Sequence, residues 1–495
     1  MSDDRKAISS GRVLAASAWA LISRGSVRML GLVSTIVLAR LLTPTDFGIV
    51  GMAMIVVGFS EAVLEFGVRA ILIHRSNLTR EDYDTAWTLN VIQGAMATAI
   101  TAALAIPAAH YFHDPRLPVV ILALATGMMI GSMENIGVVN FQRDLEFSRD
   151  FILFVARKMA GVVVGITAAI IFQSYWAMVC GYLATQTVGT TVSYAIHPYR
   201  PRLSFAKLRE FLRFSVWLSV RQVGAFARER VDRFIVGGSA SSAVMGYYTI
   251  ASELTEIVSS ELMAPIGRAL LPAFAGLQGQ HERLRAAVRT AIGGVTTIVM
   301  PAAAGMAFVA HDLVVVVLGS KWLAAVPILQ ILALAVLLRS VSFTMGMLLT
   351  AVGRLAFHTF MIWLQVAAFW GLWAFWLYTH GAEGAALARL GAASGFAAIM
   401  CLYAIVTGFL RVRDLIGTLT RPVAATAGMI AVLAWLQPQL ANGTITALAM
   451  CVVAGVSTYS SLLIVLWAAS GRPDGVERIV LNHAMERLHA IRGGT

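Results

Sequence analysis

The sequence predicts an all-α polytopic membrane protein, and three observations support this fold class. First, 58% of the 495 residues are hydrophobic without counting the 42 glycines, whereas soluble domains contain about 45–50% apolar residues with glycine included. Second, only 13% of the residues are charged, against about 25% in soluble domains. Third, the mean hydropathy is +0.76. These values exclude a soluble enzyme, a disordered chain and a disulfide-rich secreted scaffold.

Fourteen apolar stretches are long enough to cross a bilayer, which requires about 20 residues in a helix. The first six lie at 15–41, 45–68, 84–109, 117–140, 148–172 and 175–196. The next six lie at 211–237, 243–265, 286–310, 322–350, 355–380 and 383–409, and the last two at 417–437 and 443–470. We expect each to be a helix, because a helix satisfies all of its backbone polar groups within the hydrocarbon.

The distribution of Lys and Arg predicts the orientation of these spans. If the N-terminus is cytoplasmic, the inner segments hold 25 of these residues and the outer segments hold 2, Arg116 and Lys321. Positive charge in short loops is typical of the cytoplasmic side. We therefore expect both termini in the cytoplasm, and most of the net charge of +12 concerns orientation rather than nucleic acid.

The two halves of the chain resemble each other at an offset near 200 residues. Residues 121–125 and 331–335 both read ILALA, and Trp19 and Arg24 correspond to Trp217 and Arg221. Because six spans separate the copies, both start on the same side of the membrane, as in parallel-repeat transporters. We expect two six-helix lobes around a central cavity.

The predicted organisation follows this repeat. A cytoplasmic N-tail at 1–14 precedes the first lobe at 15–196, and a cytoplasmic inter-lobe loop at 197–210 leads to the second lobe at 211–409. Two additional helices occupy 417–470. The tail at 471–495 has an amphipathic pattern and is expected to lie on the inner leaflet.

Ionisable residues deep in the spans are the candidate functional residues, since each costs about 2.5–3.5 kcal/mol at a helix centre. Arginines concentrate in spans 1 and 7, and carboxylates in spans 2 and 8, which are repeat equivalents. The cations are Arg24, Arg28, Arg221 and Arg228, and the acids are Glu253, Glu256, Asp232 and Glu61. This pattern favours a hydrated, charged cavity. The competing interpretation is that the charges only pair to hold the lobes together.

No metal-binding or catalytic pattern accompanies these charges. All three cysteines fall inside spans and the histidines are scattered, so we expect neither a metal site nor another cofactor. Asp82-Tyr83-Asp84 matches the DxD motif of sugar-nucleotide enzymes but stands alone in a short loop. The predicted outer loops are too short for the catalytic residues of a polysaccharide polymerase or ligase, and we do not expect an enzyme.

Several segments resemble bacterial polysaccharide-unit flippases, the Wzx-type members of the multidrug/oligosaccharidyl-lipid/polysaccharide exporter superfamily. LARLLTPTDFGIVGMAMIVVGF at 38–59 and FGVRAILIHR at 66–75 resemble the first two spans of that family. The stretch 314–334 resembles another recurrent segment, and VDRFIVGGSAS at 231–241 resembles the end of span 7. The anchors of 314–334 are Gly319, Trp322, Ala325 and Leu329. These motifs indicate the fold more than the substrate.

The resemblance implies an alternating-access flippase of the bacterial inner membrane. Its cargo would be a polyprenyl-diphosphate-linked oligosaccharide repeat unit, moved from the inner to the outer leaflet during exopolysaccharide, capsule or O-antigen synthesis. The cavity cations would then bind the headgroup, and the acids would be candidates for ion coupling. The expected partners are this lipid and the membrane lipids, with a polysaccharide polymerase and chain-length proteins as further candidates, and no nucleic acid.

Two alternatives stay open within the same superfamily. A cation-coupled drug antiporter would favour acids and aromatic residues over arginines in its site, and the arginine content argues against it. A lipid II flippase carries a similar headgroup, and the sequence does not separate it from the first interpretation.

Overall fold

The computed structural model describes Gly25 and residues 29–64, 67–75, 78–144, 146–377, 380–440 and 443–471. The predicted N-tail, the interfacial C-tail, and Arg24 and Arg28 in the first span lie outside these residues. Within the described ranges the regular elements are all helical. The chain divides into two compact units, Met1–Gly246 and Tyr247–Thr495. The division falls inside helix α10 (Ser242–Ala275).

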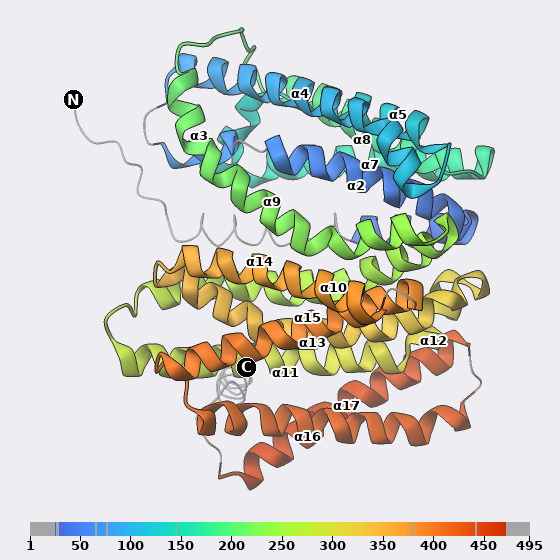
Figure 1. Cartoon of the computed structure of the whole chain (residues 1–495), viewed down its shortest axis with the longest axis vertical. Coiled ribbons are helices and arrows are strands. Elements are labelled where there is room, and N and C mark those ends of the chain that lie inside the picture. The colour runs from blue at the N-terminus through green and yellow to red at the C-terminus, as the bar shows by residue number, and fades with distance from the viewer. Residues whose placement is uncertain are drawn as a thin grey trace, which may run out of the picture. The chain divides into compact units, whose positions relative to one another are not determined.

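The first unit is built from long helices that run side by side (Figure 1). After a helix at Met29–Leu41, its elements are α2 (Pro44–Leu64), α3 (Val68–His74), α4 (Arg80–Phe112), α5 (Leu117–Ser132), η1 (Ile136–Val138), α6 (Val139–Arg143), α7 (Phe147–Phe172), α8 (Trp176–Ile196) and α9 (Leu208–Ser239). The first turn of α10 completes it.

The second unit continues α10 with a similar set of long helices. Its elements are α11 (His281–Phe308), α12 (Ala310–Leu313), η2 (Val314–Leu318), η3 (Ser320–Ala325), α13 (Val326–Ala351), α14 (Leu355–Leu372), η4 (Trp373–Leu377), α15 (Gly381–Val406), α16 (Val412–Leu436), η6 (Gln437–Gln439) and α17 (Ile445–Ala469). Helices α16 and α17 pack against each other, as the red pair in Figure 1 shows.

The helices have the length and composition of membrane spans. Nine of the described helices are long and apolar enough to cross a bilayer, and a tenth span results if the bent pair Leu117–Ser132 and Ile136–Arg143 counts as one. Helices α8, α9 and α10 are also long enough, with 21, 32 and 34 residues. Their polar and charged side chains lower their hydropathy, and for α9 and α10 these are the charges that suggested function. The chain is thus an all-α polytopic membrane protein.

In the first unit, turns predicted on one side of the membrane lie at one end of the helices. At the end predicted to be inner, Arg143 donates to the carbonyl of Arg75 at 2.9 Å. At the end predicted to be outer, the backbone N–H of Tyr175 donates to Asp46 at 2.9 Å. These contacts join turns that alternate along the chain, as the predicted topology requires. We call these the inner and outer ends.

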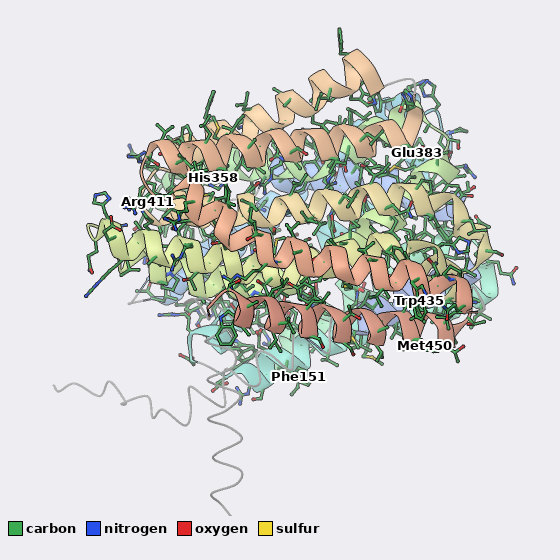
Figure 2. The ribbon with its side chains drawn as sticks, turned by 90° about the horizontal axis from the view of Figure 1, so that it is seen from below. Phe151, His358, Glu383, Arg411, Trp435 and Met450 are labelled. Atoms are coloured by element: carbon green, nitrogen blue, oxygen red, sulfur yellow. The ribbon has the colours of Figure 1, made fainter. Side chains whose placement is uncertain are left out.

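The second unit shows the same alternation. At its inner end Arg285 donates to the carbonyl of Gly408 at 2.9 Å, and at its outer end Gln437 donates to Asp312 at 3.1 Å. Figure 2 places His358 and Arg411 toward one end of this unit and Glu383 toward the other.

The internal repeat also has a structural counterpart. The two ILALA segments lie in α5 and α13, and both of these helices carry proline at their second position. A His-Asp pair precedes each, at residues 113–114 and 311–312, and both aspartates are buried. Among the anchors of segment 314–334, Trp322, Ala325 and Leu329 are 0%, 1% and 0% exposed, so these residues stabilise the fold.

Helices α7 and α8 approach each other through glycine. A Cβ atom added to Gly181 would lie 2.9 Å from the carbonyl oxygen of Gly161 and 3.2 Å from the Cα of Gly165. Small residues allow this close approach. Because apolar side chains are as well solvated by lipid as by another helix, the van der Waals contacts of the close approach stabilise the helix pair.

Gly181→Ala is therefore expected to destabilise the protein by about 1–3 kcal/mol, the usual cost of overpacking. Gly395→Ala is the control, because a Cβ at Gly395 meets nothing within 4 Å and alanine is the better helix former. The free energy of unfolding in detergent should fall for the first variant and hold or rise for the second. Equal stabilities would contradict the close α7–α8 packing.

Candidate functional site

Helix α9 carries a concentration of charge within a membrane span. Arg228, Glu229, Arg230, Asp232 and Arg233 follow one another within six positions. At about 1.5 Å per residue, Arg228 lies roughly 16 Å from the outer end of the helix, near the bilayer midplane. Hydrocarbon cannot solvate a charge at this depth, so such residues are candidates for a functional role.

The packing of α9 against α2 shows which way the charges project. Phe226 contacts Phe59 with ring centroids 6.3 Å apart, and a Cβ at Gly237 would lie 3.2 Å from Met52. Arg228 is two positions from Phe226, about 200° around the helix. Asp232 shares the side of Arg228, since it lies four residues after it. Arg228 and Asp232 form a charged stripe on the side of α9 that faces away from α2.

The residues of this region differ in exposure. Asp232 and Arg233 are 1% and 5% exposed, and the backbone N–H of Arg233 donates to the Asp232 carboxylate at 2.9 Å. The Arg228 side chain is 27% exposed and lies 3.5 Å from the Glu229 carboxylate. Arg228 thus combines a midspan position with an accessible guanidinium. The backbone of Arg221 lies on the same helix.

Apart from Asp232 on α9, the predicted acids lie on two helices of different units. Glu61 is on α2 in the first unit and is exposed, and Glu253 and Glu256 are half-buried on α10 in the second unit. On α10 they share a face with Thr249 and Ser252, both buried. The opposite face of α10 packs into an apolar core with α11 and α13, through residues such as Leu262 and Val299. The second unit therefore presents α10 with one polar face.

A buried ion pair at a broken helix was not among the predicted site residues. Helix α5 stops at Ser132, and a bend of 65° separates it from Ile136–Arg143. Glu134 lies in the bend, is 7% exposed, and accepts a hydrogen bond from Arg157 of α7 at 2.7 Å. Asn135 holds the bend by accepting from the N–H of Gly137 at 2.9 Å. Both residues lie in apolar stretches of the sequence, but no sequence pattern indicates that they pair.

The aspartates of the DxD-like motif have structural roles at the inner end. Asp82 accepts hydrogen bonds from Thr79, Arg75 and Lys207, each at 2.8 Å. Asp84 accepts from the N–H of Arg202 at 2.9 Å. Both carboxylates thus fix the connector between α8 and α9 to the start of α4.

Comparisons with known proteins agree with this architecture. The family model for polysaccharide biosynthesis proteins matches residues 37–327, more than half of the chain. The lipopolysaccharide biosynthesis protein WzxC of Escherichia coli (strain K12) is 25% identical over 419 residues, 82% of each chain. The succinoglycan biosynthesis transport protein ExoT of Rhizobium meliloti (strain 1021) is 22% identical over 321 residues, 64% of this chain and 65% of that protein.

Among solved structures, the lipid II flippase MurJ in an inward closed conformation matches with a TM-score of 0.74 and 12% identity, covering 93% of this chain and 100% of that chain. An inward-facing multidrug resistance transporter of the MATE family matches with a TM-score of 0.61 and 15% identity, over 77% and 94% of the two chains. At these identities the similarity establishes the transporter fold alone. The match of the family model, by contrast, covers more than half of the chain, including α2, α9 and α10, and the chain belongs to the polysaccharide biosynthesis protein family.

Proposed function

We propose that the protein is a flippase for a polyprenyl-diphosphate-linked oligosaccharide repeat unit. It moves this lipid from the inner to the outer leaflet of the bacterial inner membrane by alternating access, with both termini in the cytoplasm. The observation that carries the proposal is the charged stripe of α9 at midspan depth in a polysaccharide biosynthesis family member. No covalent step is part of the proposal.

The chemistry of the stripe suits a diphosphate. A diphosphate and its sugars cannot cross hydrocarbon unaided, because burying unsolvated charge is prohibitive. A guanidinium offers paired N–H donors that match phosphate oxygens and stays charged at every physiological pH. We assign Arg228 and Arg221 of α9, with Arg24 and Arg28 of the first span, to the headgroup.

The membrane potential supplies part of the driving force for outward transport. A diphosphate carries about two negative charges, and moving each outward across an inside-negative membrane is favoured by about 2.3 kcal/mol per 100 mV. Return of the empty carrier then needs a separate driving force. Protonation or cation binding at Glu253 or Glu256 is the proposed coupling step, with Asp232 and Glu61 as further candidates.

Deleting the gene in its host is expected to abolish the surface polysaccharide, because its repeat units stay on the inner leaflet. The lipid extract should then contain polyprenyl-diphosphate-linked repeat units that are inaccessible to an impermeant sugar-oxidising reagent added outside. Complementation with the intact gene is the control and should restore both polymer and access.

Two outcomes would contradict this function. Unchanged lipid intermediates with lost drug resistance would favour a cation-coupled antiporter. Accumulated lipid II with intact polysaccharide would favour a lipid II flippase. The same experiment tests the partners, because a polymerase and chain-length proteins can act only on units that have reached the outer leaflet.

A further inference from the structure

The first turn of α10 packs closely against the first turn of α2 at the outer end of the first unit. A Cβ added to Gly48 would lie 1.6 Å from the carbonyl oxygen of Ser242, and one added to Gly246 would lie 1.8 Å from that of Pro44. No side chain fits between two backbones this close. The two helices therefore meet through their main chains.

The contact is reciprocal. Pro44 begins α2 and Ser242 begins α10, and each glycine is the fifth residue of its helix. Each glycine thus faces the carbonyl of the first residue of the other helix. Such close approaches gain dispersion energy and weak Cα–H···O contacts without interlocking side chains. A surface of this kind can separate and re-form without repacking a core.

One polar contact accompanies the glycines. The Ser242 hydroxyl donates to Asp114 at 2.7 Å, and Asp114 is 3% exposed. Arg116 holds the same carboxylate through its backbone N–H at 3.0 Å and its side chain at 2.7 and 2.9 Å. Burial alone would raise the pKa of Asp114, but the hydrogen bonds from Arg116 and Ser242 lower it below its ordinary value. The carboxylate is therefore ionised at neutral pH and a strong acceptor.

The surrounding turns keep the α2 side of this contact in place. Asp46 caps the start of α2 by accepting from the N–H of Thr43 at 2.9 Å, and its second oxygen accepts from the N–H of Tyr175. The start of α2 is thus fixed to the α7–α8 turn that carries Tyr175. Helix α10, in contrast, passes out of this unit directly after Gly246.

We propose that Gly48, Gly246, Ser242 and Asp114 form a releasable outer latch. When closed, it holds the start of α10 against α2; its release lets the start of α10 part from α2 at the outer end. The proposal rests on alternating access in the proposed function, since a carrier that delivers outward must open this end. Thr249 lies three residues past Gly246 on the same side of α10 and is 6% exposed, so it is a buried reporter next to the latch.

Accessibility of a cysteine at position 249 measures the latch directly. In a background without Cys180, Cys401 and Cys451, Thr249→Cys should react slowly with a membrane-impermeant thiol reagent added outside. Adding Gly48→Ala or Gly246→Ala should raise the labelling rate about tenfold, the factor that typical overpacking strain imposes on a two-state equilibrium. Gly395→Ala is the matched control, because its Cβ meets nothing within 4 Å, and it should leave the rate unchanged.

A reversible cross-link separates a latch from a permanent anchor. Asp114→Cys with Ser242→Cys, joined by a short bis-thiosulfonate, should stop polysaccharide export, and reduction should return it to the level before cross-linking. Export that continues in cross-linked protein, or labelling unchanged in folded Gly246→Ala protein, would overturn the latch. Labelling requires no substrate, so the latch can fail while the deletion phenotype still supports the flippase.

Discussion

Arg157→Ala is expected to lower the free energy of unfolding by about 3 kcal/mol, one of the largest single-residue effects in the described chain. Removing one member of a buried ion pair commonly costs about 3–5 kcal/mol, because the partner charge is left uncompensated. We expect the lower end, since the Arg157 side chain is 22% exposed. The Glu134 side chain, at 9% exposure, would lose this ion pair in a place with little access to water.

The same helix provides a matched control. Arg149 of α7 forms an ion pair with Glu146 at 3.2 Å, but the two side chains are 56% and 48% exposed. Exposed pairs contribute about 0–1 kcal/mol, so Arg149→Ala should be nearly neutral. Denaturant titration in detergent compares the two variants, and the double replacement of Glu134 and Arg157 by alanine should recover part of the loss. An Arg157→Ala protein as stable as the Arg149→Ala protein would mean that the pair is already hydrated.

This pair shows where prediction from sequence reaches its limit. The amino-acid sequence alone shows that Glu134 and Arg157 lie in apolar stretches, because hydropathy is calculated from neighbours in the sequence. That they meet depends on the 65° bend after α5 and on how α5 and α7 each pack against α8, which no local pattern encodes. The DxD-like motif is similar, since its structural role depends on Lys207 and Arg202, more than 100 residues away.

The spans were easier to predict because the bilayer imposes one length and one composition on every helix. Helices α9 and α10 are exceptions, because their charges keep their hydropathy below that of most other spans. They could still be predicted as spans, because the loops before and after them must alternate between the inner and the outer side of the membrane. Segment 314–334 was predicted as a family marker, and its anchors are explained by burial of Trp322 and Leu329. The outer latch left no pattern in the sequence, because a glycine in a helix indicates close approach only once its neighbour is known.

Arg228→Ala is expected to slow polysaccharide export tenfold or more while the protein still inserts in the membrane. Hydrogen bonds to a charged group contribute about 1.5–3 kcal/mol, and 1.4 kcal/mol corresponds to a factor of ten. Arg221→Ala and Arg24→Ala should have the same effect if these arginines share the headgroup. Arg209→Ala, at the exposed inner end of α9, is the control and should export normally. Normal export by all three substituted proteins would exclude a headgroup role for these arginines.

The neighbour of Arg228 distinguishes a substrate role from a structural one. Arg228 and Glu229 lie 3.5 Å apart, with side chains 27% and 47% exposed. If Arg228 acted only through this pair, Glu229→Ala would remove the same interaction, and the two variants would export alike. If Arg228 binds the diphosphate, Glu229→Ala should leave export near normal, or increase it by removing a like charge from the path of an anion. Arg228→Lys should then restore export only in part, since an ammonium keeps the charge but loses the paired N–H donors. Measured together in one deletion strain, the three variants separate pairing, charge and donor geometry at a single position of α9.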